Sequence, residues 1–264
     1  MIAGLRIALA VAAFALLTPP LVLMQMIANR TGLFSRNIAP RLWHRLVLKC
    51  LGIQLRVRGD LSTQRPLLVV ANHVSWVDIM VLGANADVHF VAKADVAGWP
   101  GMGRLAKLNQ TVFVERERKA KTAEKASEIA TRLSAGDALA LFPEGTTADG
   151  NTILPFKTSL FGAASLALEE TQAQTVYIQP AAITYTRLHG VPLGRKRAIW
   201  ASWVGDLELV PHIGRLLRER ALDAELHFGE PIAFTAGSSR KVAAKQAEDA
   251  VRAMLRTIRA NPHP

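Results

Sequence analysis

The feature that most constrains this chain is an uncharged, largely apolar stretch near its N-terminus, which runs from Ile7 to Asn29. A helix over this stretch, at about 1.5 Å per residue, would reach across a hydrocarbon layer of about 30 Å. Pro19 and Pro20 lie in its middle, and because proline lacks a backbone N–H and disfavours helical geometry before it, we expect two short helical pieces. A kinked membrane span and a shallow hairpin both fit this pattern. A cleaved signal peptide is a further interpretation, which lacks a small-residue cleavage signature.

The charge of the chain points toward an anionic partner. The 264 residues have a formal net charge of +11, and residues 1 to 60 contain eight basic side chains and one acidic one, a net +7. Nucleic acid, an acidic protein and a membrane surface are the candidate partners. Because the excess flanks the apolar stretch and no nucleic-acid fold signature occurs, the membrane is favoured over a basic binding protein. The single cysteine, Cys50, excludes an internal disulfide and indicates a reducing compartment, and no Cys/His cluster has zinc-ligand spacing.

A second N-terminal segment has the pattern of an amphipathic helix. From Ile38 to Leu51 apolar residues recur at helical spacing, and Gly52 follows as a helix-ending residue. Such a helix can lie in the membrane interface or pack its apolar face on a globular domain, and both interpretations are open. The side opposite the apolar face carries Arg41, His44, Arg45 and Lys49.

After Gly52 short strands alternate with helices, which is typical of an α/β fold. Strands are expected at 53–58, 66–71, 87–92, 111–115, 138–142, 176–184, 198–204 and 225–228. Helices are expected to begin near Ser75 and to cover 119–134, 159–169, 213–222 and 240–259. We therefore predict a mixed, largely parallel sheet with helices on both faces, preceded by an N-terminal helical membrane anchor. The predicted division is a membrane-associating helical region at 1–52 and a globular domain at 53–264.

One histidine and one aspartate stand where α/β folds gather active-site residues. Asn72 and His73 directly follow the apolar run 66–71, and Asp78 can reach the imidazole if a helix begins near Ser75. A carboxylate on one ring nitrogen fixes the tautomer and stabilises the positive charge that forms when the other nitrogen takes a proton. The pair can therefore act as a general base toward an alcohol. From these residues alone, a structural, hydrogen-bonded histidine is an equal alternative.

Other strand ends carry glycine or basic residues. The segment Phe142-Pro143-Glu144-Gly145-Thr146 follows an apolar strand, and its glycine allows close backbone approach to a ligand, although a plain strand-to-turn junction is the alternative. Lys93 and Arg116 also follow strands and offer charges that suit phosphate oxygens, or they are solvated surface residues.

Taken together, four segments resemble the sequence blocks of the glycerolipid acyltransferases typified by bacterial 1-acylglycerol-3-phosphate acyltransferase. They occur in the family's order and approximate spacing, and are Asn72-His73-x4-Asp78, Phe113-Val114-Glu115-Arg116, Phe142-Pro143-Glu144-Gly145-Thr146 and Ile178-Gln179-Pro180. The resemblance covers about residues 66 to 185 and makes 53–264 the expected acyltransferase domain. It implies that His73 is the base and Asp78 its partner. The substrate-binding residues that it implies are Asn72, Lys93, Arg116, Glu144, Gly145, Thr146 and Lys157, with Pro180 on the acyl-donor side.

Two departures from the family pattern concern the acceptor. Thr147 and Ala148 stand where many members have arginine and serine, and Ser159 stands where they have glycine. A missing arginine weakens recognition of a compact phosphate. The expected reaction still moves a fatty acyl group from a thioester, acyl-ACP or acyl-CoA, to the free hydroxyl of a lysolipid.

The first expectation for the acceptor is 1-acyl-glycerol-3-phosphate, giving phosphatidic acid, and a lyso-ornithine lipid is the alternative. No cofactor or metal is expected besides the acyl donor, and no nucleic acid is expected as a partner. The expected location is the bacterial inner membrane, with the active site on the cytoplasmic side.

Overall fold

The computed structural model describes residues 2–114, 119–171, 174–205 and 207–260. The described strands form one sheet in the order β1-β8-β6-β2-β5-β3-β4, with β7 and β9 pairing with β6. The strands β6, β2, β5, β3 and β4 run parallel to one another, whereas β8 is antiparallel to β6 and parallel to β1. The predicted mixed, largely parallel sheet is therefore confirmed. The strands are β1 (Ile53–Arg58), β2 (Leu67–Ala71), β3 (His89–Lys93), β4 (Val112–Val114), β5 (Ala138–Leu141), β6 (Val176–Leu188), β7 (Val191–Pro192), β8 (Leu222–Phe228) and β9 (Ile232–Phe234).

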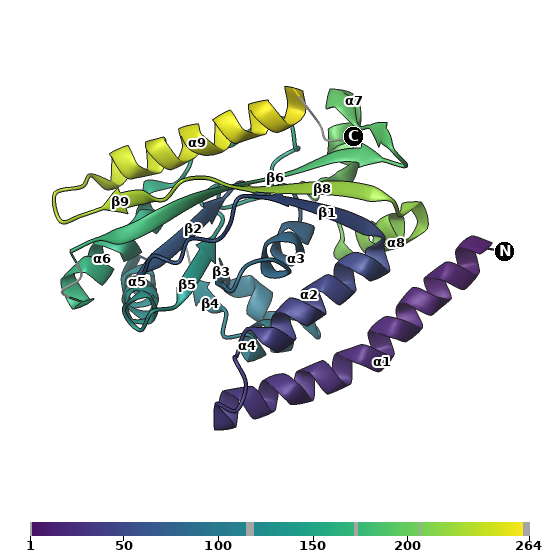
Figure 1. Cartoon of the computed structure of the whole chain (residues 1–264), viewed down its shortest axis with the longest axis horizontal. Coiled ribbons are helices and arrows are strands. Elements are labelled where there is room, and N and C mark those ends of the chain that lie inside the picture. The colour runs from purple at the N-terminus through teal and green to yellow at the C-terminus, as the bar shows by residue number, and fades with distance from the viewer. Residues whose placement is uncertain (1, 115–118, 172–173, 206, 261–264) are drawn as a thin grey trace.

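Helices cover both faces of this sheet, and α9 lies on the opposite side of it from α1 and α2 (Figure 1). One core lies under α2, α3 and α8, and the other lies under α5, α6 and α9. The helices are α1 (Ile2–Thr31), α2 (Ile38–Leu51), α3 (Val77–Gly83), η1 (Ala94–Gly98), α4 (Met102–Leu108), α5 (Lys119–Ser134), η2 (Thr158–Phe161), α6 (Gly162–Thr171), α7 (Gly194–Ala201), α8 (Leu209–Glu219) and α9 (Arg240–Ala260).

The central strand β2 is buried on both faces, which is why it occurs in the sequence as a short apolar run. All five of its residues are buried, and they alternate between the two cores, with Leu67, Val69 and Ala71 on one side and Leu68 and Val70 on the other. A strand buried on both faces needs no polar alternation, which is the pattern of parallel sheets. The residue after β2 is therefore fixed at the edge of a rigid element.

The N-terminal stretch differs from the expectation of two pieces. α1 is one helical element that contains Pro19 and Pro20. The missing N–H groups of two adjacent prolines interrupt the helical bonding locally, and α1 is nevertheless one continuous helix (Figure 1). This helix has the length and apolar composition needed to cross a membrane, and few of its residues are buried.

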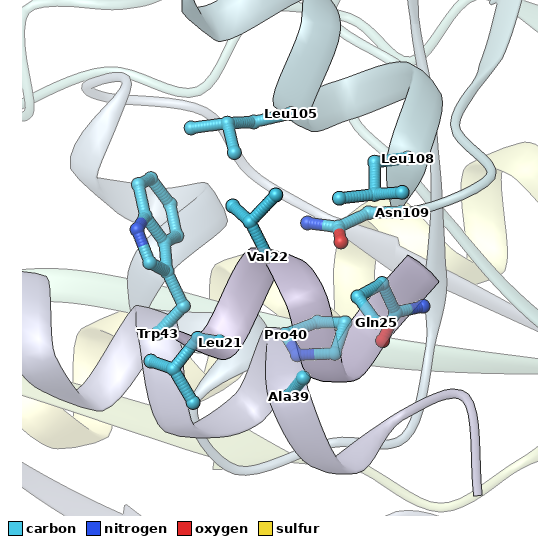
Figure 2. Close-up of a pocket in the computed structure, with 9 residues that line it drawn as sticks. All are labelled: Leu21, Val22, Gln25, Ala39, Pro40, Trp43, Leu105, Leu108 and Asn109. Atoms are coloured by element: carbon cyan, nitrogen blue, oxygen red, sulfur yellow. The ribbon is translucent and has the colours of Figure 1, made fainter. Parts of the chain in front are cut away.

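α1 lies against the folded domain and is joined to it by polar contacts. It packs beside α2, and the Asn29 amide donates to the Leu108 carbonyl of α4 at 2.9 Å. Near its other end, the Ala10 carbonyl accepts a bond from the Cys50 thiol of α2. Where α1, α2 and α4 meet, Val22, Trp43 and Leu105 surround a void of about 10 Å³ (Figure 2).

The amphipathic helix α2 buries its apolar face in the domain. Trp43, Val47 and Leu51 belong to the core beneath it, and Gly52 ends the helix with a positive φ of 69°. His44 was predicted on the polar side, and this is wrong: the ring is buried against Gly83 and Phe90.

The strand predicted at 198–204 is also wrong, because the structure has α7 (Gly194–Ala201) there. Ile199 and Trp200 have the β propensity that suggested a strand, but so short an apolar run does not distinguish strand from helix. The turn at β7, where the Leu193 N–H donates to the Thr186 carbonyl at 2.9 Å, carries the chain away from the sheet before α7 begins.

Candidate active site

The site begins where β2 ends. The buried Asn72 side chain donates to the Ile183 carbonyl at 2.9 Å and accepts from the Ile183 N–H at 2.8 Å, so it ties the end of β2 to β6. This position leaves the amide facing the protein interior. The predicted contact of Asn72 with substrate stays a prediction, and the role visible in the structure is to fix the strand end that carries His73.

His73 and Asp78 are brought together as the spacing predicted. The His73 Nδ1 lies 2.9 Å from the Asp78 Oδ2, and the two side chains are 17% and 0% exposed. α3 begins at Val77, so the chain turns back and places the carboxylate beneath the imidazole. The His73 ring stacks on the Phe142 ring with centroids 4.1 Å apart and planes 16° apart. Nε2 is then the ring nitrogen left to exchange a proton with a substrate.

The carboxylate of Asp78 is held by donors on every side. The backbone N–H groups of Val74 and Ser75 donate to Oδ2 at 2.6 and 2.8 Å, and the Tyr185 hydroxyl donates to Oδ1 at 2.7 Å. Burial, and next the charge of Asp78, raise the pKa of Tyr185 well above its usual value, so the phenol stays protonated and remains a donor. These bonds hold the carboxylate oxygens in one orientation beside the imidazole.

Glu144 joins the second motif to the first. Its Oε1 accepts the His73 N–H and its Oε2 accepts the Leu154 N–H, both at 2.8 Å, and the side chain is buried. Burial raises the pKa of Glu144 to about 7, against the opposing effect of the two N–H donors. The predicted role of Glu144 in shaping the acceptor site stays a prediction, and the visible contacts hold the backbone of His73.

A cavity of about 360 Å³ opens in front of His73. Most of its lining is apolar or aromatic, which suits an acyl chain. Its side chains come from the loop that carries His73 and from α3, from β3, η1 and α4, and from Trp203 and the start of α8. They include Trp76, Ile79, Met80, Phe90, Trp99, Met102, Trp203 and Leu209.

The other predicted residues fall into three groups. Lys93, Gly145 and Thr146 line the cavity with His73, and Gly145 has a φ of 78° that L side chains rarely adopt. Lys157 is exposed and is absent from this lining, and its neighbours Thr158 and Ser159 line a separate hollow with Arg240. Arg116 lies outside the described residues. The predicted contacts of these residues with substrate stay predictions.

No sequence pattern indicated two contributors to the site, Tyr185 and Trp203. Tyr185 lies just past the expected end of its strand, and a buried tyrosine generally needs a partner for its hydroxyl. Thr147 donates to the Trp203 carbonyl, and the Trp203 N–H donates to the Val74 carbonyl at 2.9 Å. No local pattern marked Trp203, because the segment around it was expected to be a strand.

Base, carboxylate and cavity together suit proton removal from a hydroxyl held against an apolar wall. Asp78 fixes the imidazole and stabilises its charged form, while the stacked Phe142 limits the motion of the ring. Within the described part of the chain, no three His, Cys, Asp or Glu side chains are grouped as a metal site would need.

Comparisons with known proteins identify the family. The family model described as Acyltransferase matches residues 53–184. The chain is 48% identical over 257 residues to a lyso-ornithine lipid O-acyltransferase of Brucella abortus, covering 97% of this chain and 96% of that protein. It is 36% identical over 132 residues to a 1-acyl-sn-glycerol-3-phosphate acyltransferase of Neisseria meningitidis, covering 49% and 51%.

A solved structure shares the fold. The crystal structure of a 1-acyl-sn-glycerophosphate acyltransferase from Thermotoga maritima matches with a TM-score of 0.63 and 21% identity, over 99% of this chain and 100% of that one. The resemblance carried by the four sequence motifs is thus confirmed, and the chain belongs to the acyltransferase family of enzymes.

Proposed function

We propose that this enzyme transfers a fatty acyl group to the free hydroxyl of a lyso-ornithine lipid. The similarity to the Brucella lyso-ornithine enzyme extends over nearly all of both chains, whereas the similarity to the Neisseria glycerophosphate enzyme extends over about half of each. The alternative acceptor of the sequence analysis is therefore the better supported one, and the chemistry is the same for both.

The observation that carries the choice of acceptor is the charge of the cavity. Lys93 and Asp95 are the charged side chains among its described lining residues, and the Lys93 Nζ pairs with the Asp95 Oδ2. Thr147 lines the wall where many family members have arginine, and its hydroxyl is bound to the Trp203 carbonyl. A paired cation and anion complement a zwitterionic amino-acid head group better than a phosphate, which needs an excess of positive charge.

In the proposed reaction the Nε2 of His73 takes the proton of the acceptor hydroxyl as its oxygen attacks the carbonyl carbon of an acyl thioester. The new C–O bond forms a tetrahedral oxyanion, which collapses as the C–S bond breaks. The thiolate leaves and takes the proton from the imidazolium, so the products are an ester and a free thiol. The donor is an acyl thioester of acyl carrier protein or coenzyme A, and no further cofactor takes part.

The proposed location is the inner membrane of a bacterium, with the site on the cytoplasmic side. α1 lies against α2, α4 and α8, so a bilayer crossed by α1 would have to contain part of the folded domain. We therefore favour an α1 that lies in one face of the membrane and exposes its leucines to lipid.

The test is a panel of acceptors offered to the purified enzyme with a labelled acyl thioester. Lyso-ornithine lipid should react with a kcat/KM at least about tenfold above that of 1-acyl-glycerol-3-phosphate, which corresponds to about 1.4 kcal/mol of discrimination. Equal or faster transfer to the phosphate acceptor would contradict the assignment.

Two variants separate the reaction from the choice of acceptor. His73→Ala should lose transfer to both acceptors, and transfer at a rate near that of the wild type would refute the assignment of the base. Thr147→Arg should raise relative activity with the phosphate acceptor, because it adds a cation at the cavity wall. An unchanged ratio of the activities with the two acceptors would show that charge at the cavity wall does not select the acceptor.

A further inference from the structure

A second apolar surface lies at the mouth of the cavity. We define the rim segment as residues 207–210, of which the last two begin α8. Leu207 and Val210 are exposed, Val210 to 77%, whereas Leu209 between them lines the cavity. Neighbouring residues of one short segment thus face the active-site cavity and the surroundings of the protein.

The cavity and α1 are on the same side of the molecule. One wall of the cavity includes Met102 of α4, and another includes Leu209 of α8. α1 contacts both helices, and its bond to α4 runs from the Asn29 amide to the Leu108 carbonyl. A lipid layer that covers the exposed leucines of α1 therefore also lies close to the rim segment.

Charge on the helices beside α8 favours an anionic lipid surface over a protein partner. Residues 1 to 60, which contain α1 and α2, have a net charge of +7, and both helices contact α8, the helix that carries Val210. The exposed Glu208 opposes deep insertion, so contact is shallow. Basic residues beside exposed apolar side chains are the pattern of segments that bind at the bilayer interface.

We propose that the rim segment is a second lipid contact, which sets the mouth of the cavity against the same bilayer surface as α1. The proposal rests on the proposed function, because a lysolipid acceptor that stays in the bilayer must enter the cavity from that surface. The ligand is an anionic bilayer, and the contacts are the side chains of Leu207 and Val210.

The rim is joined directly to the catalytic loops. The Trp203 indole donates to the Leu207 carbonyl at 2.7 Å, and the Trp203 N–H donates to the Val74 carbonyl next to His73. The Thr147 hydroxyl bonds the same residue. A lipid contact at the rim therefore holds the cavity mouth in a fixed position relative to the base.

The direct test places a fluorescent label at single cysteines in full-length protein. Cys50 is the sole native cysteine and is replaced by serine. A bimane label is then attached at Val210→Cys, at Leu16→Cys on α1 as a reference, and at Val242→Cys on α9 as a control. These residues are 77%, 75% and 54% exposed, and α9 lies on the far side of the sheet (Figure 1). The vesicles contain phosphatidylglycerol, phosphatidylethanolamine and a nitroxide-labelled lipid that quenches the label on contact.

The proposal expects quenching at Leu16 and Val210 and none at Val242. Quenching at Leu16 alone would overturn it, and so would quenching at neither or at all three positions. This measurement needs no catalysis, so its failure is distinguishable from failure of the acceptor assay, which would overturn the proposed function.

Kinetics supply a second readout. Val210→Glu should raise the apparent KM for lysolipid in vesicles about tenfold, because a charge replaces an apolar side chain at the lipid surface, and leave kcat nearly unchanged. With a short-chain, water-soluble acceptor the variant should match the wild type. Val242→Glu should match the wild type in both assays. An unchanged KM in Val210→Glu, or an equal increase in Val242→Glu, would overturn the proposal.

Discussion

Asp78 has no contact with the cavity, yet it determines how His73 behaves. Four donors surround its two oxygens: the His73 ring, the N–H groups of Val74 and Ser75, and the Tyr185 hydroxyl. A buried carboxylate with all these bonds is fixed in one orientation. Tyr185 is thus a positioning residue that acts through Asp78.

Tyr185→Phe removes one of these donors and should lower kcat/KM about tenfold, in line with the loss of a hydrogen bond to a charged group. The hydroxyl does not line the cavity, so the loss should appear in kcat and leave the KM for the acceptor nearly unchanged. Steady-state rates measured over a range of acceptor concentrations would separate the two constants.

The chain offers a matched control on the same strand. Tyr177→Phe removes a phenol hydroxyl from the beginning of β6, where the ring is only partly buried. Its kcat and KM should match those of the wild type. A Tyr185→Phe variant that keeps the kcat of the wild type would show that the hydroxyl contributes packing alone.

Glu144 makes stability depend on pH. Because burial raises its pKa to about 7 from 4.5, the folded state holds the proton more tightly than the unfolded state. The resulting stabilisation is complete below about pH 4.5 and is lost as the pH rises through about 7, a change on the order of 3 kcal/mol. In Glu144→Gln the free energy of unfolding should therefore fall less between pH 5 and pH 8. Denaturant unfolding in detergent, followed by tryptophan fluorescence, measures this difference, and equal falls in both proteins would contradict it.

Between elements, the contact of α2 with α3 depends on a glycine. A Cβ added to Gly83 would lie 2.2 Å from the Nδ1 of His44, whose ring is buried. Burial lowers the pKa of His44 to about 4, so the ring is neutral and packs as an aromatic side chain. The absence of a side chain at Gly83 is what lets the two helices approach.

Gly83→Ala should therefore destabilise the protein by about 2 to 3 kcal/mol, the usual range for overpacking. In the double variant His44→Ala/Gly83→Ala the loss should be smaller than the sum of the single losses, because the clash is absent. Thermal unfolding of the four proteins in detergent completes the cycle. Additive losses would contradict the contact.

Gly214→Ala is the control for a glycine inside a helix. Nothing lies within 4 Å of the Cβ that it would add to α8. This variant should gain up to about 1 kcal/mol from the better helix propensity of alanine. A loss as large as that of Gly83→Ala would show that any methyl group in these helices disrupts the fold.

The helices and strands that the sequence predicted correctly are those with a regular pattern of buried residues. β2 and β5 are apolar runs buried on both faces, and the periodic helix α9 is observed at 240–260 against an expected 240–259. α7 was mistaken for a strand because its apolar residues are few, and α1 continues past two prolines. In both cases tertiary packing determines the secondary structure, and the local sequence pattern does not predict that packing.

Over the whole molecule, the same distinction separates the parts of the site. His73 and Asp78 are five residues apart, so their geometry follows from one local turn, and it was predictable. Tyr185 and Trp203 lie more than a hundred residues further along the chain, and only the order of the strands brings them to His73. The proposed lipid contact of the rim segment likewise follows from the packing of α1 on the domain, and no sequence motif predicts that packing.

The distribution of charge and apolar surface over the molecule leads to the last prediction. The net charge of +11 attracts the protein to anionic lipid, whereas the exposed leucines of α1 bind through the hydrophobic effect. In about 1 M salt, where the Debye length is about 3 Å, only the first contribution is screened. The protein should therefore stay in the membrane pellet in high salt and leave it in detergent.

A variant with polar substitutions on α1 separates the two contributions. Leu9→Ser, Leu16→Ser and Leu23→Ser together remove exposed apolar surface from α1 and leave the charge unchanged. This variant should still pellet with anionic vesicles at low salt, because the basic residues remain, and it should be released at high salt. Complete release of the wild type by salt would show that charge alone holds the protein, and α1 would then have to be assigned to packing within the protein.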